Sequence, residues 1–121
     1  MLSLIVSGVA NTVLAQEQSV TNSLIAQGAR VFKKNCAECH SYGYGTDGAK
    51  VKPAVAALQI KYKGALSPYL EERSDLAAPI LEVFIRNGIV SMTPFRKTEV
   101  SDKDITAIAA YLKNSASNKV K

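Results

Sequence analysis

The stretch Cys36-Ala37-Glu38-Cys39-His40 decides the fold of this chain, because it gathers both cysteines and the only histidine within five residues. On a helical turn, positions 36, 39 and 40 stand at i, i+3 and i+4, so these three side chains share one face. Ala37 and Glu38 point elsewhere, and their identities matter little. The motif is compatible with a redox dithiol, a metal site or the attachment point of a larger group.

The first two interpretations fit the surrounding sequence poorly. A thioredoxin-like dithiol usually follows a β-strand in a βαβ unit, whereas Ile25, Ala29 and Phe32 have the spacing of a helix. Structural zinc prefers four Cys or His ligands, and this chain offers only three. Adjacent Cys39 and His40 also chelate a single ion poorly. Both interpretations stay open as minor alternatives, together with a chance match to the motif.

The pattern C-x-x-C-H is the signature of covalent haem attachment. The sulfur atoms of Cys36 and Cys39 can add to the vinyl groups of haem as thioethers, and the imidazole of His40 is then delivered beneath the ring to ligate the iron. We therefore predict one covalently bound haem c as the cofactor, held by Cys36 and Cys39, with His40 as a metal ligand.

Met92 is the best candidate for the second axial ligand. No other histidine and no further cysteine exist, and the only other methionine is Met1. Met92 lies in the Gly/Ser/Thr/Pro segment NGIVSMTPFRK, which predicts a loop able to reach across a haem. Thioether sulfur suits Fe(II), and His/Met ligation raises the reduction potential. The alternative is a methionine that fills a gap in the core.

A six-coordinate iron has no open position, so His40 and Met92 together predict electron transfer and no catalysis at the iron. An open-site haem enzyme of the peroxidase type, or a gas binder, would require Met92 to leave the iron. We keep this as a less favoured alternative.

The N-terminal residues indicate export. The segment MLSLIVSGVANTVLAQEQ begins with an apolar stretch, and Val13-Leu14-Ala15 resembles a signal-peptidase site, although basic residues are missing before it. We predict a signal peptide over residues 1–15 and a periplasmic mature protein. The apolar stretch is too short for a stable membrane span. An ordinary N-terminal helix and an uncleaved anchor are the alternatives.

The spacing of the apolar residues and the positions of proline, glycine and capping residues predict helices and no pair of strands. Residues 16–26 are mostly polar and suggest a flexible lead-in, with a helix over about 24–34. Further helices are expected from Pro53, over 76–87, and from Ser101, where Asp104 completes a capping box. Residues 116–121 suggest a frayed tail. The sum is an all-α fold of three to five helices and loops wrapped around one covalently bound haem.

From Gln27 to Lys113, the chain resembles the class I c-type cytochromes. The resemblance is carried by the haem motif, the glycine-rich loop before Pro53, the segment IRNGIVSMTPF and the closing SDKDITAIAAYLKN. It implies a small cytochrome c domain over residues 27–115. Met92 falls where the axial methionine of the family lies, with Thr93 intervening before Pro94.

The resemblance also implies contacts. Gly28 and Phe32 on the first helix should meet the face of the last helix that bears Tyr111. The carbonyl of Pro53 should accept a hydrogen bond from His40 Nδ1–H, which would make Pro53 part of the cofactor-binding site. Candidates for holding the haem propionates are Tyr62, Tyr69 and Arg86.

A narrower resemblance concerns residues 69–95, YLEERSDLAAPILEVFIRNGIVSMTPF, which look like the small cytochrome subunits of flavocytochrome phenol dehydrogenases such as p-cresol methylhydroxylase.

The expected function is that of a soluble mono-haem electron carrier between a periplasmic donor and a respiratory acceptor. The alternative is a tightly bound, electron-accepting subunit of a periplasmic flavoprotein dehydrogenase.

The charge of the chain bears on its partners. A formal net charge of +5 favours redox proteins that are acidic at the contact, such as a flavoprotein dehydrogenase or a terminal oxidase or cytochrome. Because the basic residues are scattered, nucleic acid is not expected as a partner. We expect four cations to ring part of the haem edge, with a generic solvated surface as the alternative: Lys33, Lys34, Arg96 and Lys97.

Overall fold

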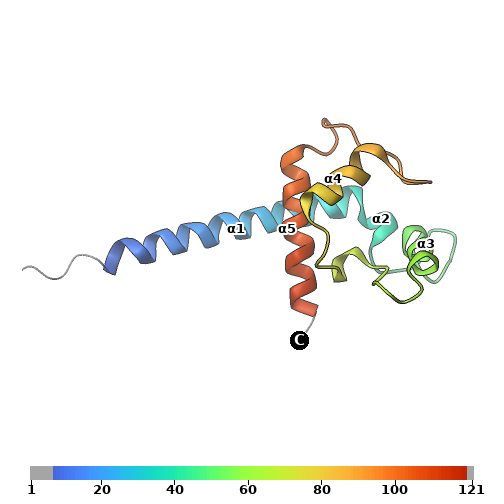
Figure 1. The fold of residues 1–121 in the computed structure, drawn as a ribbon, viewed down its shortest axis with the longest axis horizontal. Coiled ribbons are helices and arrows are strands. Elements are labelled where there is room, and N and C mark those ends of the chain that lie inside the picture. The colour runs from blue at the N-terminus through green and yellow to red at the C-terminus, as the bar shows by residue number, and fades with distance from the viewer. Residues whose placement is uncertain (1–6, 120–121) are drawn as a thin grey trace, which may run out of the picture.

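The structure is a computed structural model in which residues 7–119 are described (Figure 1). This part of the chain holds five α-helices and one 3₁₀ helix. They are α1 (Ser7–Asn35), α2 (Ala37–His40), α3 (Pro53–Tyr62), η1 (Leu70–Glu72), α4 (Ala78–Asn87) and α5 (Asp102–Lys119). Within these residues the only β-type pairing is an isolated bridge between Ile89 and Met92. The prediction of an all-α fold is confirmed.

Helix α1 is longer than the sequence predicted, and its first turns project away from the rest of the protein (Figure 1). Residues 16–26, expected as a flexible lead-in, lie inside it. The segment from Val9 to Gln27 contains neither glycine nor proline, and Gln and Glu are good helix formers. Thr21 Oγ1 also donates to the Glu17 carbonyl, one turn earlier, at 2.9 Å.

Of the predicted signal peptide, residues 1–6 lie outside the described residues and residues 7–15 form the start of α1. Cleavage and export stay predictions. No helix within residues 7–119 combines the length and the apolar character needed to cross a membrane.

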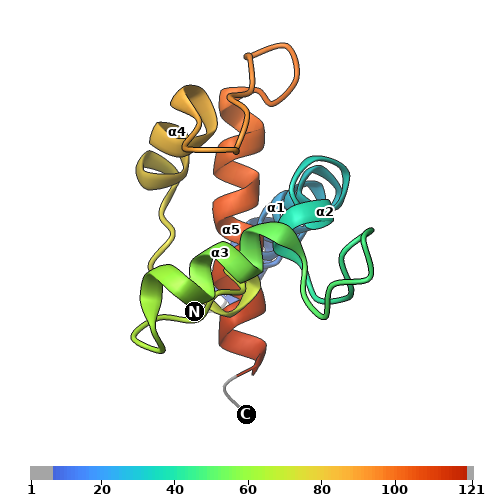
Figure 2. The same cartoon turned by 90° about the vertical axis from the view of Figure 1, so that its right-hand side faces the viewer.

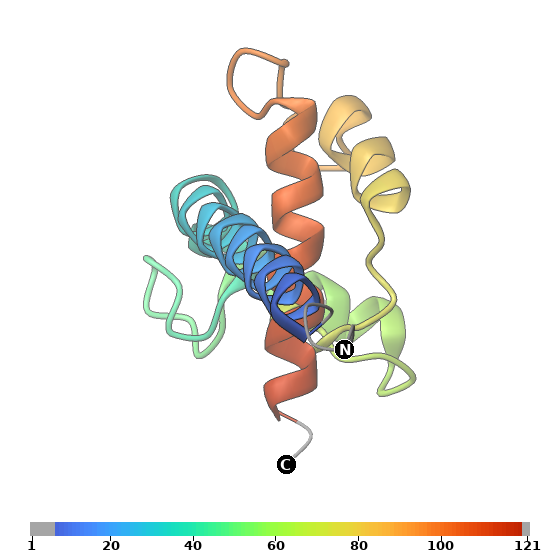
Figure 3. The same ribbon diagram turned by 90° about the vertical axis from the view of Figure 1, so that its left-hand side faces the viewer.

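Helices α1 and α5 cross at close range, as Figures 1 and 3 show. A Cβ added to Gly28 would lie 1.9 Å from the Ala107 carbonyl oxygen and 2.8 Å from Tyr111 Cβ, so only glycine fits there. One turn on, the rings of Phe32 and Tyr111 are 5.5 Å apart, tilted by 48°. The predicted contact between the first and last helices is confirmed.

The capping box at the start of α5 is also confirmed. The backbone N–H of Ser101 donates to Asp104 Oδ2 at 2.9 Å, and the backbone N–H of Asp104 donates to Ser101 Oγ at 3.1 Å. Gln27 Nε2 donates to Asp104 Oδ1 at 3.0 Å, which ties α1 to the beginning of α5.

The C-terminal segment differs from its prediction. Residues 116–119, expected to be frayed, continue α5, and Ala116 is buried. Lys119 Nζ donates to Tyr42 Oη at 2.7 Å and lies 3.9 Å from the centre of the Tyr42 ring. A small buried side chain and a long-range contact therefore extend the helix beyond what local composition indicates. Residues 120–121 lie outside the described residues.

The hydrophobic core follows α5 and fixes α4 against it. Its buried members are Phe32, Leu76, Leu81, Ile85, Val100, Ile105, Ile108 and Leu112. Helix α3 begins at Pro53 as predicted, while α4 begins at Ala78, two residues later than expected, since its N-cap Ala77 has an extended backbone. Leu76 precedes the helix and is buried in the core. In Figure 2, α4 lies to the left of the upper part of α5, α3 crosses in front of its lower part, and α2 lies to the right of α5.

Candidate haem-binding site

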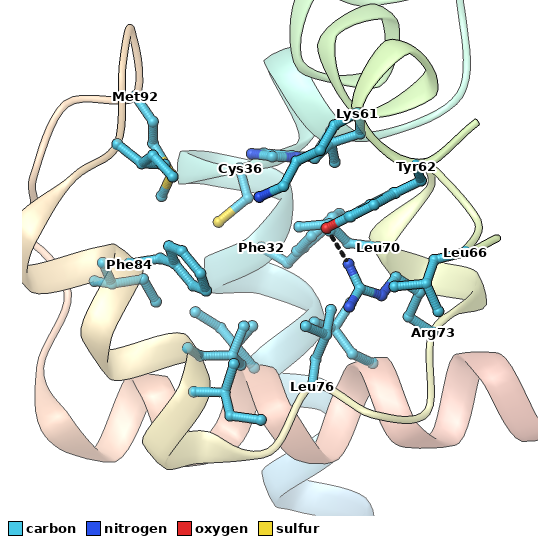
Figure 4. Close-up of a pocket in the computed structure, with 18 residues that line it drawn as sticks. Phe32, Cys36, Lys61, Tyr62, Leu66, Leu70, Arg73, Leu76, Phe84 and Met92 are labelled. Carbon is cyan, nitrogen blue, oxygen red and sulfur yellow. Dashed lines mark hydrogen bonds between the residues drawn. The ribbon is translucent and has the colours of Figure 1, made fainter. Parts of the chain in front are cut away.

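A cavity of about 400 Å³ lies where α1, α2, α3, α4 and α5 face one another (Figure 4). Its size is within the range of small-molecule and cofactor sites. Most of its lining is apolar and comes from Phe32, Leu58, Leu66, Leu70, Leu76, Ile80, Leu81, Phe84, Ile85, Ile89, Ile108 and Leu112. The other lining residues are Cys36, His40, Lys61, Tyr62, Arg73 and Met92.

The haem motif forms the helical turn that the sequence predicts. The backbone N–H groups of Cys39 and His40 both donate to the Cys36 carbonyl, at 3.1 and 2.9 Å. Cys36 and His40 line the cavity, whereas Cys39 is exposed and is not among the lining residues. Burial, with a smaller contribution from Cys39, raises the pKa of the Cys36 thiol to about 11.

His40 is poised as a neutral imidazole. Burial lowers its pKa, because desolvation disfavours the charged form. Its Nδ1 is buried and has no hydrogen-bond partner in the described part of the chain. The hydrogen bond that His40 Nδ1–H was expected to donate to the Pro53 carbonyl is therefore absent, and Pro53 itself is exposed and does not line the cavity. As the first residue of α3, Pro53 has its carbonyl directed along the helix axis.

The loop after α4 brings Met92 to the cavity. Gly88 ends the helix with φ 67°, and a Cβ there would lie 2.5 Å from the Met92 carbonyl oxygen. Ile89 and Met92 then exchange backbone hydrogen bonds of 2.8 and 3.2 Å, which close a tight turn. Figure 4 shows the Met92 side chain directed into the cavity. Thr93 leaves this placement intact.

The structure assigns different polar residues to the cavity than the sequence suggested. Of the propionate candidates only Tyr62 lines it. Tyr69 stacks on Tyr42, with ring centres 4.2 Å apart. The guanidinium of Arg86 instead donates to the carbonyls of Phe95 and Val100, at 3.1 and 2.8 Å.

Sequence reasoning missed Arg73. This arginine lines the cavity and donates to Tyr62 Oη at 2.7 Å, from the segment just after η1. Arg73 and Asp75 form an ion pair at 2.5 Å that orients the guanidinium. Their closeness in the segment ERSD was the only sequence signal that could have pointed to Arg73.

Two of the four cations expected at the haem edge are engaged elsewhere. Arg96 pairs with Glu99 at 3.4 Å, and Lys97 pairs with Asp102 at 2.8 Å. Lys33 and Lys34 lie in the last turn of α1 and are exposed. Their role at the haem edge stays a prediction.

The site suits haem better than a bare metal ion. Among residues 7–119, no three His, Cys, Asp or Glu side chains are grouped so as to hold an ion. The cavity instead offers apolar walls, a thiol on a helical turn, a buried imidazole and a thioether from a distant loop. These are the groups that a covalently attached, axially ligated haem requires.

Comparison with known proteins agrees with this geometry. The family described as cytochrome C oxidase, cbb3-type, subunit III matches residues 23–112. A cytochrome c6 of Limnospira maxima is 32% identical over 92 residues, which cover 76% of this chain and 93% of the relative. A cytochrome c6 of a Picosynechococcus species is 33% identical over 96 residues, covering 77% and 74%.

No solved structure matches the chain. Neither relative is named as a flavocytochrome subunit, so the narrower resemblance to p-cresol methylhydroxylase receives no support from these comparisons. The chain belongs to the class I c-type cytochromes, mono-haem electron carriers rather than enzymes, and this membership implies covalently bound haem c.

Proposed function

We propose that this cytochrome carries single electrons through a haem joined by thioethers to Cys36 and Cys39 and ligated by His40 and Met92. The observation that carries the proposal is the convergence of Cys36, His40 and Met92 on one apolar cavity, from segments far apart in the sequence. When bound, haem c supplies one-electron chemistry at its iron.

The protein contributes a site that changes little between oxidation states. His40 comes from a helical turn, and Met92 from a turn closed by the backbone pair with Ile89. Core residues such as Ile85 and Ile108 form the back of the cavity and exclude water. Holding the ligands in place and keeping the surroundings dry both reduce the reorganisation that accompanies electron transfer.

We further propose that the protein is exported to the periplasm and exchanges electrons with partner proteins that are acidic at the contact. The signal-like N-terminus and the net charge of +5 support this. The matched family is named after a subunit of an oxidase. This name favours a terminal oxidase, rather than a flavoprotein dehydrogenase, as the class of redox partner.

Replacement of Met92 tests the ligation. The variant Met92→Leu preserves side-chain volume but removes the sulfur, so we expect full covalent haem by mass, complete loss of the weak far-red band of ferric Met–haem ligation, and a lower midpoint potential. Ser91→Ala, an exposed neighbour on the same turn, is the control and should keep both band and potential. An unchanged band and potential in Met92→Leu would contradict the proposed ligand.

A further inference from the structure

The loop between α4 and α5 carries Met92 and folds back onto α4 (Figure 2). It leaves the helix at Gly88 and returns at Phe95, whose backbone N–H donates to the Ile85 carbonyl at 2.7 Å. Met92 therefore lies in a stretch of chain whose two ends are both attached to the end of α4. Residues 93–96 adopt neither helix nor strand. Such a segment depends on contacts with other elements to hold one conformation.

Arg86 makes these contacts with a single side chain. Its Nη1 donates to the carbonyls of Phe95 and Val100, at 3.1 and 2.8 Å, and its Nη2 donates to Asp102 Oδ1 at 2.7 Å. The guanidinium thus ties α4 to the middle of the loop, to its end and to the first residue of α5. Because the side chain is only 17% exposed, solvent competes little for these bonds.

Asp102 fixes the guanidinium from the side of α5. Its Oδ1 accepts from Arg86, and its Oδ2 accepts from Lys97 Nζ at 2.8 Å. This carboxylate therefore joins α4, the loop and α5. Asp102 is itself exposed, so solvent screens the ion pairs, and the bonds from Arg86 to the two loop carbonyls contribute more to the attachment.

A second ion pair in the same loop offers a comparison within the molecule. Arg96 pairs with Glu99 three residues away, at 3.4 Å, and its side chain is 81% exposed. This pair joins neighbouring residues of the loop, whereas Arg86 and Asp102 lie 16 residues apart on two helices. Loss of the Arg96 guanidinium therefore changes the charge of the loop without releasing it from α4.

The proposed ligand Met92 has more need of such support than His40. A thioether is a soft, neutral donor, and ferric iron is harder than ferrous iron, so the sulfur suits the oxidised state less well. His40 is held by the helical turn of the haem motif, whereas Met92 is held by the loop. The free energy needed to open the loop therefore determines how easily another ligand replaces the sulfur.

We propose, on the basis of the haem ligation proposed above, that Arg86 is a positioning residue that holds the Met92 loop closed and thereby excludes other ligands from the iron. Arg86 does not line the cavity, so it acts through the loop. With the loop attached at Phe95 and Val100, Met92 stays directed into the cavity and the protein remains an electron carrier. When this attachment is lost, the loop opens more often and the position of Met92 becomes available to small ligands.

The test is a titration of the purified ferric holoprotein with imidazole, followed by the loss of the far-red band of Met–haem ligation. In Arg86→Gln we expect imidazole to bind about tenfold more tightly than in the unsubstituted protein, because charge-assisted hydrogen bonds to the closed loop are lost. Arg86→Lys keeps the charge without the fork, and Asp102→Asn keeps the bonds to the carbonyls, so both should lie between the two. Arg96→Gln is the matched control and should bind imidazole as the unsubstituted protein does.

Amide hydrogen exchange supplies a readout that does not depend on the iron. The backbone N–H groups of Met92 and Phe95 are both hydrogen-bonded, and their protection should fall in Arg86→Gln. The protection of Ile108, buried in the middle of α5, should change less. Asp104→Asn, which weakens the start of α5 without removing a contact of Arg86, should leave the affinity for imidazole unchanged.

Equal affinities for imidazole in Arg86→Gln and Arg96→Gln, or a loss of protection at Ile108 as large as that at Phe95, would overturn the proposal. If Arg86→Gln fails to acquire haem, Arg86→Lys and Asp102→Asn decide the matter by the same criteria. A far-red band missing from the unsubstituted protein would overturn the proposed ligation, which is a separate outcome. Hydrogen exchange at Phe95 would then still test whether Arg86 holds the loop.

Discussion

At the crossing of α1 and α5 the two backbones touch, whereas between α3 and α4 the side chains face a cavity of about 400 Å³. The crossing is filled by protein alone, with Gly28 against the Ala107 carbonyl and Phe32 2% exposed. On the cavity side, Ile80 and Phe84 line the wall and are 44% and 37% exposed.

This difference shows which part of the fold depends on the cofactor. Helix α5 packs against α1, η1 and α4, whereas α3 packs mainly against the short helix α2. The α1–α5 crossing can hold its structure through its own contacts. The apolar side chains that line the cavity near α3 are removed from water only when a cofactor fills it, because exposed apolar surface is unfavourable.

The largest expected effect follows from preventing haem attachment. In Cys36→Ala/Cys39→Ala we expect complete loss of the covalent haem, seen by mass, and loss of amide protection in hydrogen exchange over α3. The central turns of α5, around Ile108, should keep most of their protection. Glu38→Gln, an exposed change in the same helical turn, should keep both. Equal loss of protection in α3 and α5 would show that the crossing also depends on haem.

The next largest effect concerns the crossing itself. Gly28→Ala would place a Cβ 1.9 Å from the Ala107 carbonyl oxygen. Because that oxygen belongs to the backbone of α5, the two helices would have to move apart, which costs free energy. We expect the free energy of unfolding, measured by urea titration, to fall by more than about 3 kcal/mol. Gly64→Ala is the comparison, since it has open space and a φ of +86° and should cost only about 1 kcal/mol. Similar losses in the two variants would mean that the helices can separate without penalty.

The features that could be predicted from sequence are those with local signatures. The haem motif fixes its own turn through bonds to the Cys36 carbonyl, and Ser101 with Asp104 forms a cap whose two bonds lie within four residues. Gly28 was informative because a glycine inside a helix is costly without a close neighbour.

Other features depend on tertiary contacts that no short window contains. Arg73 and Arg86 are both arginines near acidic residues, yet only Arg73 reaches the cavity. Arg86 is held by the carbonyls of the loop after Met92, and sequence spacing does not reveal where that loop folds back. The length of α5 likewise depends on the contact between Lys119 and Tyr42, which are far apart in the chain.

The smallest expected effect is a pH-dependent change in stability caused by Asp104 at the start of α5. Hydrogen bonds from Gln27 first, and then from the backbone and hydroxyl of Ser101, lower the pKa of Asp104 from 3.8. A carboxyl whose pKa is lower in the folded state stabilises the fold above its unfolded pKa and loses that contribution as pH falls through the folded value. Asp104→Asn should therefore cost about 1 kcal/mol at pH 7, typical of a helix cap, and the difference from the unsubstituted protein should shrink below about pH 4.

Asp47→Asn, in the exposed loop after the haem motif, is the control for Asp104→Asn, because it makes the same chemical change away from the junction of α1 and α5. Urea titrations from pH 7 to pH 2 measure both variants, and the visible spectrum reports on the haem in the same samples. Because Asp104 acts on the junction of α1 and α5 and does not line the cavity, the spectrum at neutral pH should not change. An altered spectrum in Asp104→Asn would mean that the crossing and the cavity are coupled, so that the cap of α5 helps to position the haem ligands.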